Sequence, residues 1–263
     1  MAVRVFLAHQ VNSLCDVYHV SIITNMRGAN NFLDNISDEI NIIDLPIKRG
    51  INFFYDFYVL FLLIILLRKN KFSLVHSISP KAGLLTAISA WIVRVPNRLH
   101  TFTGQVWSTK KGFSRWLLKS MDKLIITLNT LILIDSFTQK EFLIHQNLIN
   151  NESALVLGKG SLSGVDLNRF KPSIQEKESL RKKLNISSKD VVFLFVGRIK
   201  KDKGVFELIK AFKSISKKYS NTVLLIVGPD EDNLIDELTT ILDSSIKYTR
   251  FIDFTKTPEI YMM

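Results

Sequence analysis

Short apolar runs alternate along the first half of the chain with longer stretches whose apolar residues have helical spacing. The runs predicted to be strands cover residues 20–24, 40–43, 74–76, 98–102 and 131–134. The predicted helices cover residues 51–70, 81–93, 113–124 and 138–145. Strands that alternate with helices favour βαβ units and a parallel sheet.

The same alternation restarts in the second half, after a charged stretch at residues 172–190 that we predict to be a linker with a short helix. The predicted elements that follow are strand 191–196, helix 204–218, strand 222–227 and helix 233–242. Uninterrupted apolar runs such as 191–196 predict strands that are covered on both faces. We therefore expect an α/β fold with two Rossmann-like domains, residues 1–171 and a partial domain at 191–263.

Length and cysteine content narrow the class of protein. A chain of 263 residues suits two modest domains. The single cysteine, Cys15, cannot form an internal disulfide and suits a reducing compartment. The first residues lack the signal-peptide pattern of basic, apolar and small residues, because Arg4 lies in a mixed segment with His9 and Gln10. These features predict a cytoplasmic protein.

The chain is basic, with a formal net charge of +11. Lysine and arginine cluster in the second half, at residues 181–183, 200–203 and 217–218. Such a balance attracts anions, which leaves nucleic acid, a nucleotide or an acidic membrane face as partners. The same lysines could simply be solvated on helix faces, so charge alone does not choose between these partners.

One apolar run, residues 57–67, needs to be distinguished from a membrane span. It is bounded by Asp56 on one side and by the basic residues 68–71 on the other. A span needs about 20 apolar residues, so this run does not cross a bilayer. A buried helix of the α/β domain is one interpretation. A helix whose outer face enters the bilayer beside the basic cluster is the other.

The clearest candidate binding site is the segment 195–204, FVGRIKKDKG. A buried strand is predicted to end at Gly197, a basic loop with Arg198 follows, and a helix begins just past Lys203 and Gly204. Ligands of open α/β sheets bind beyond the carboxyl ends of the strands, where a helix N-terminus offers unpaired N–H groups. The segment therefore predicts a site for a phosphate-bearing anion. An ordinary basic strand-to-helix turn is the alternative.

This segment resembles the Gly-Arg and Lys-Gly pairs of the group 1 family of retaining glycosyltransferases, enzymes of the GT-B type with two Rossmann-like domains. The resemblance runs along essentially the whole chain. It implies that Arg198 and Lys203 are the catalytic cations that hold the diphosphate of a nucleotide sugar. Gly197 and Gly204, which flank them, are then part of the donor site.

Two more segments of the chain carry the resemblance. Residues 227–229, Val-Gly-Pro, match the strand end that typically faces the nucleotide base, which adds Gly228 to the donor site. Residues 161–166, Ser-Leu-Ser-Gly-Val-Asp, match an interdomain signature that usually reads Asn-Gly-Val-Asp. Ser163 stands here where asparagine is usual.

In the first half, the resemblance points to an acceptor site. A Val-His pair places His76 near the acceptor cleft, although a core or helix-capping histidine is an equal interpretation. Residues 101–104 align with a family loop that often reads Thr-x-His-Gly, so Thr103 stands at the histidine position and Gly104 at the glycine. Threonine at that position resembles a branch of surface-polysaccharide enzymes. His100 is in the wrong register for that histidine's role. The cleft between the domains is expected to be lined by His76, Gly104, Ser163, Arg198 and Lys203.

The resemblance is incomplete in two places. The family's Glu-x7-Glu donor motif is missing, since Glu207 and Glu231 lie in another context, and so is the glycine-rich loop after a first strand. Residues 3–14 form a helical stripe, so the chain is predicted to open on a helix, and another helix is predicted to start at Pro258. We therefore expect both domains to be incomplete and this chain, as it stands, not to be a competent catalyst.

The reaction implied by the resemblance is transfer of a hexosyl group from a nucleoside diphosphate sugar, with retention of configuration. The implied acceptor is a glycan on a polyprenyl diphosphate, in capsule or lipopolysaccharide synthesis at the inner membrane face. Fixed cations and a helix dipole can stabilise the departing diphosphate, so we expect no metal and no other cofactor.

The sequence bears on three other functions for the chain. A nicotinamide oxidoreductase would need a Gly-x-Gly-x-x-Gly turn, which the chain lacks. A nucleic-acid binder would explain the charge, but the chain has no zinc-ligand spacing, recognition-helix signal or RNA-binding aromatic strand, so no nucleic-acid partner is expected. A catalytically inactive remnant of a glycosyltransferase is the third.

Overall fold

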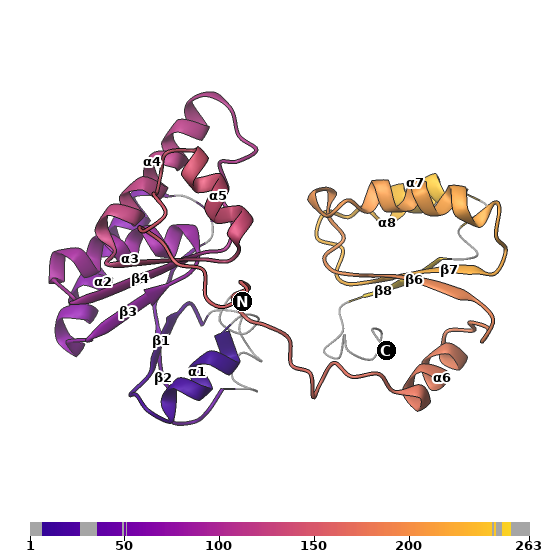
Figure 1. Cartoon of the computed structure of the whole chain (residues 1–263), viewed down its shortest axis with the longest axis horizontal. Helices are drawn as coiled ribbons and strands as arrows, with labels where there is room; N and C mark the ends of the chain where they lie inside the picture. Colours follow the sequence, from indigo (N-terminus) through magenta and orange to yellow (C-terminus); the bar gives the residue numbers. More distant parts are fainter. Residues whose placement is uncertain are drawn as a thin grey trace. The chain divides into compact units, whose positions relative to one another are not determined.

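The computed structural model describes residues 7–26, 36–48, 50, 52–243, 245 and 249–253. The chain divides into two compact units, residues 1–164 and 165–263 (Figure 1). Both are parallel α/β structures, as the alternating pattern predicted.

In the residues that the structure describes, the strands of the first unit form two separate parallel sheets. The strands are β1 (Ser21–Thr24), β2 (Asn41–Asp44), β3 (Leu74–Ser77), β4 (Asn97–Phe102) and β5 (Leu131–Ile134). β1 pairs with β2, and β3, β4 and β5 form a separate sheet in that order. Among the described residues, no strand pairs with both β1 and β3.

The described part of the first unit has five helices: α1 (Ala8–Cys15), α2 (Phe53–Asn70), α3 (Pro80–Val93), α4 (Gly112–Leu128) and α5 (Phe137–His145). α2 begins where the side chain of Asn52 accepts a hydrogen bond from the backbone N–H of Tyr55, and it ends at Lys71 in the left-handed conformation. The proline at the start of α3 suits a first helical turn. α3 packs between α2 and α4.

The second unit is a three-stranded sheet with helices. It contains α6 (Ile174–Lys183), β6 (Val191–Val196), the short 3₁₀ turn η2 (Lys201–Lys203), α7 (Val205–Ser216), β7 (Thr222–Val227), α8 (Ile235–Leu242) and β8 (Thr249–Ile252). β7 is the middle strand, and all its residues are buried. α7 and α8 lie together on one face of this sheet (Figure 1). Phe212, Leu224 and Leu238 form part of the core between them.

The prediction that the strand 191–196 is covered on both faces is wrong. Val191, Phe193 and Val196 are exposed, and within the described residues β6 is an edge strand that pairs with β7. An apolar run indicates that a strand can be buried, but the strands and helices packed beside that strand decide which of its faces are covered. The helix predicted from residue 258 falls outside the described residues.

Candidate functional site

In the second unit, the loops after β6 and β7 are joined beyond the ends of the strands. The backbone N–H of Gly197 donates to the carbonyl of Val227, and that of Ile199 donates to the carbonyl of Pro229, both at 2.9 Å. Gly228 has a φ of 148°, and a Cβ atom there would lie 1.9 Å from the carbonyl oxygen of Gly197. Only glycine allows this approach, so Gly228 fixes how the two loops meet.

The predicted phosphate site lies at this carboxyl edge. Arg198 follows the end of β6, Lys203 ends the turn η2, and Gly204, with a φ of 72°, leads directly into α7. The N–H groups of the first turn of α7 and the positive end of its dipole therefore follow Lys203 directly, in the same loop as Arg198. The structure gathers the sequence-predicted residues Gly197, Arg198, Lys203, Gly204 and Gly228 in one loop cluster. Their role in binding the donor stays a prediction.

Acidic residues pair with the cations of this loop, and Lys203 itself lies 3.9 Å from a carboxylate oxygen of Asp202. The guanidinium Nη1 of Arg198 lies 2.9 Å from the Oε2 of Glu231, and the Nζ of Lys200 lies 3.7 Å from an oxygen of Asp232. The neighbouring Asp230 has a different task, because its carboxylate accepts from the N–H groups of Leu234 and Ile235 at the start of α8. The acidic run directly after Gly228 and Pro229 was the available signal, because that strand end meets the same edge.

Glu231→Gln is expected to raise the affinity for inorganic pyrophosphate about two- to fivefold. In the unliganded protein Glu231 competes with an anion for Arg198. A partly exposed ion pair contributes only about 0–1 kcal/mol, so the gain in affinity on removing the carboxylate charge is modest. Calorimetric titration at low salt measures it. Glu237→Gln, the same change on the exposed surface of α8, is the matched control for net charge. A loss of affinity in Glu231→Gln would show instead that Glu231 orients Arg198 for the ligand.

In the first unit, the predicted acceptor residues lie at the carboxyl ends of neighbouring strands. His76 is exposed near the end of β3, and its Nε2 lies 2.8 Å from the Oγ1 of Thr101 on β4. Thr103 and Gly104 follow β4 directly and are exposed. Ser163 is exposed, a short distance along the chain from Ser161, whose N–H donates to the carbonyl of Asp135 just after β5.

His100 is part of the core of the first unit. It is buried, the Oγ of Ser77 lies 2.8 Å from its Nδ1, and Phe102 contacts its ring edge-on. Burial lowers the pKa of His100 to about 3, and the neighbouring His76 lowers it further. A Cβ atom on Gly83 would come within 2.4 Å of the imidazole, so the glycine makes room for the ring. His100 is therefore neutral near pH 7.

A buried tryptophan anchors the loop that carries Thr103 and Gly104. The indole N–H of Trp107 donates to a carboxylate oxygen of Asp122 on α4 at 2.7 Å, and both side chains are buried. Burial raises the pKa of Asp122 to about 6, although the hydrogen bond from Trp107 acts in the opposite direction. Gln139 on α5 adds a hydrogen bond to Gln105 of the same loop at 3.2 Å. The loop after β4 is thus held at both α4 and α5.

Asp122→Asn is expected to stabilise the protein above about pH 6, by at most about 3 kcal/mol, and to have little effect below about pH 4. The pKa of Asp122 is about 6 in the folded state and 3.8 ordinarily. Between these values the folded protein keeps a proton that the unfolded chain has lost, so stability falls as pH rises through this window. Asparagine removes the ionisation and keeps an acceptor oxygen for Trp107. Urea unfolding at both pH values measures the effect, and an equal gain at both would point to packing instead.

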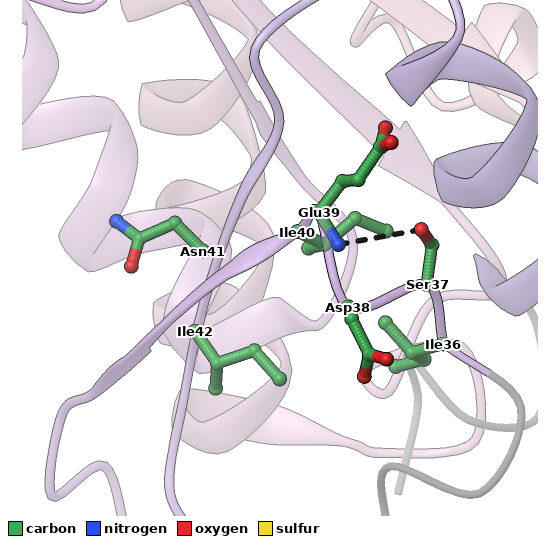
Figure 2. Close-up of a pocket in the computed structure, with 7 residues that line it drawn as sticks. All are labelled: Ile36, Ser37, Asp38, Glu39, Ile40, Asn41 and Ile42. Atoms are coloured by element: carbon green, nitrogen blue, oxygen red, sulfur yellow. Dashed lines mark hydrogen bonds between the residues drawn. The ribbon is translucent and has the colours of Figure 1, made fainter.

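The structure also has a hollow that belongs to neither set of residues. It is lined by residues 36–42, which lead into β2, and the N–H of Glu39 donates to the Oγ of Ser37 there (Figure 2). This hollow precedes β2 and so lies at the amino end of that strand, away from the carboxyl ends where ligands of parallel sheets bind. We therefore assign it no ligand.

Within the described ranges, no three histidine, cysteine, aspartate or glutamate side chains are grouped so that they could hold a metal ion. None of the helices described is both long enough and apolar enough to cross a membrane.

The sequence of the chain is similar to a family of known proteins. Residues 176–263 match the family described as "Glycosyl transferases group 1". The chain is 38% identical over 194 residues to the capsular polysaccharide biosynthesis glycosyltransferase CapM of Staphylococcus aureus, covering 73% of this chain and 50% of the relative. It is 28% identical over 202 residues to the UDP-Gal:alpha-D-GlcNAc-diphosphoundecaprenol alpha-1,3-galactosyltransferase of Escherichia coli, covering 75% of this chain and 51% of the relative.

A solved structure shows the same fold. A glycosyltransferase from Rickettsia africae matches with a TM-score of 0.70 and 16% identity, covering 97% of this chain and 65% of that one. The chain spans about half the length of the two curated relatives above. The chain belongs to the group 1 glycosyltransferase family, and its parallel α/β units have the Rossmann-like fold of GT-B enzymes.

Proposed function

We propose that the protein transfers a hexosyl group from a nucleoside diphosphate sugar to a glycan acceptor, with retention of configuration. The observation that carries this proposal is the loop cluster at the carboxyl edge of the second unit. There Arg198, Lys203 and the start of α7 belong to one loop after β6, which meets the end of β7 at a position that only glycine can occupy. The anion that suits this arrangement is a diphosphate.

The chemical task of these groups is to stabilise the leaving group. Breaking the bond between the sugar and the diphosphate places negative charge on the phosphate oxygens while the sugar becomes oxocarbenium-like. Arg198 and Lys203, with the N–H groups of α7, provide fixed positive charge at that position. In this proposal they take the place of a metal ion, so transfer needs no metal and no other cofactor.

For the acceptor, we propose a glycan carried on a polyprenyl diphosphate, used in capsule or lipopolysaccharide synthesis. The E. coli relative is named for a diphosphoundecaprenol acceptor, and the S. aureus relative for capsular polysaccharide. The acceptor side would be the carboxyl edge of the first unit, with His76, Thr103, Gly104 and Ser163. Such an acceptor places the protein on the cytoplasmic side of the inner membrane.

A transfer assay tests the proposal. The full chain is incubated with radiolabelled UDP-galactose and GlcNAc-diphosphoundecaprenol in detergent, and the lipid phase and free UDP are both measured. The proposed reaction predicts label in the lipid and an equal amount of UDP, whereas the expectation from the sequence that this chain is not a competent catalyst predicts neither. UDP release without label in the lipid would contradict the acceptor. Nucleotide binding with no consumption of several UDP-sugars would favour the catalytically inactive form.

A further inference from the structure

The outer face of α2 is apolar, although it is exposed. Phe54 is 93% exposed and Phe57 is 73% exposed. The opposite face carries Val59, Leu63 and Leu67, which are buried in the core with residues of α3. A surface helix normally has polar residues on its outer face. We call the exposed set the α2 stripe: Phe53, Phe54, Phe57, Tyr58, Phe61 and Ile65.

The α2 stripe has basic residues at one end and a lysine near the other. Arg68, Lys69 and Lys71 are exposed at the carboxyl end of the helix, and the Nζ of Lys48 lies 4.2 Å from the ring centre of Tyr55 at its start. The helix contains one acidic residue, Asp56, which pairs with Lys81 of α3 at 2.5 Å. The surface therefore presents aromatic rings and cations, a combination that fits anionic lipid headgroups above acyl chains.

A second patch of the same chemistry lies at the start of α4. Phe113 and Trp116 stack with their ring centres 5.6 Å apart, and both are exposed. They follow Lys110 and Lys111, which are exposed too. α4 is separated from α2 by α3 alone in this layer of the first unit (Figure 1).

The start of the α2 stripe and the patch on α4 lie at the same end of the helix layer. The first turns of α2 and α3 are joined by the Asp56–Lys81 pair. α3 and α4 each follow a parallel strand of one sheet, so both start at its carboxyl edge. His76 and Thr103 lie at that edge as well.

We propose that the α2 stripe, together with Phe113 and Trp116, docks the first unit on an anionic lipid bilayer, with α2 lying along the surface. The inner face of α2 is already part of the protein core, so the helix enters the bilayer to the depth of its aromatic rings and does not cross it. This inference deepens the proposed function, because it names the surface that would bring the carboxyl edge of the first unit to a lipid-linked acceptor.

The occupant that the charges favour is a bilayer rather than a second copy of the chain. Two copies meeting through the α2 stripe would each bring the basic residues of α2, and α2 supplies no unpaired carboxylate to neutralise them. Anionic lipids supply that charge directly. Trp116 and Tyr58 are also residue types that are enriched where apolar chains meet headgroups.

Vesicle flotation tests the proposal without donor or acceptor. The full chain is mixed with vesicles of phosphatidylcholine containing about 30% phosphatidylglycerol, or of phosphatidylcholine alone. The expected result is binding to the anionic vesicles that is at least about tenfold stronger and that weakens with salt. Phe54→Ser combined with Phe57→Ser is expected to reduce binding by at least about tenfold. Leu167→Ser, which changes an equally exposed apolar residue outside the stripe, is the matched control.

Thermal unfolding of the variants is expected to show an unchanged midpoint, because the two phenylalanines are exposed. If wild-type protein binds neither kind of vesicle, both this inference and the proposed place at the membrane fail. If wild type binds but the double variant binds equally well, the α2 stripe is not the docking surface, while the proposed function stands. If the double substitution abolishes self-association in the absence of lipid and leaves vesicle binding unchanged, the stripe is an interface between copies and the inference is overturned.

Discussion

Alanine at Arg198 or at Lys203 is expected to slow sugar transfer by about 10²–10³-fold, which corresponds to about 2.7–4 kcal/mol of lost transition-state stabilisation. Both cations lie in the loop between β6 and α7, at the carboxyl edge of the second unit, where the charge of a departing diphosphate is proposed to develop. Lys200→Ala is expected to do much less, because Lys200 is outside the Gly-Arg and Lys-Gly pairs.

The ratio kcat/KM for the donor, measured at fixed ionic strength, checks this ranking. Lys218→Ala, just past the far end of α7, controls for the loss of one positive charge. Equal losses at Arg198, Lys200 and Lys203 would contradict the specific roles, because they would show that the loop acts as a diffuse positive field.

Gly228→Ala is expected to destabilise the second unit by about 3 kcal/mol or more and to weaken nucleotide binding as well. The added Cβ atom would lie 1.9 Å from the carbonyl oxygen of Gly197, and the φ of 148° is unfavourable for alanine. Relief of this overlap must separate the loops after β6 and β7, which moves Arg198.

Urea unfolding and a nucleotide titration measure the two consequences of Gly228→Ala. Gly158→Ala is the control, because Gly158 also has a positive φ, of 54°, but open space where the Cβ atom would go. Gly158→Ala is expected to lower the free energy of unfolding by only about 1–2 kcal/mol. An equally small cost at Gly228 would mean that the two loops can separate without loss of structure.

Sequence reasoning located the strands and helices well, because each has a local signal. The strand before Gly197 ends where an uninterrupted apolar run meets glycine, and α2 starts at an asparagine that caps it. The same reasoning found the loop with Arg198 and Lys203 from one short segment. These features depend on residues that are close together in the chain.

The features that sequence reasoning missed all depend on residues that are distant in the chain. The pairing of Arg198 with Glu231 requires β6 and β7 to lie side by side, and the bond from Trp107 to Asp122 requires α4 to fold back on its preceding loop. The exposure of Phe193 on β6 follows from its place at the sheet edge. No local pattern contains this information.

Calorimetric titration of the chain with uridine, UMP and UDP at low salt tests the central claim most directly. The loop cluster with Arg198, Lys203 and the start of α7 is proposed to bind the diphosphate of a nucleotide sugar. The predicted result is that UDP binds at least about tenfold more tightly than UMP or uridine, because a charge-assisted contact to the second phosphate contributes about 1.5–3 kcal/mol. This preference is expected to disappear in the Arg198→Ala, Lys203→Ala double variant. Equal affinity for the three ligands, or a preference for UDP that survives the double substitution, would contradict the account.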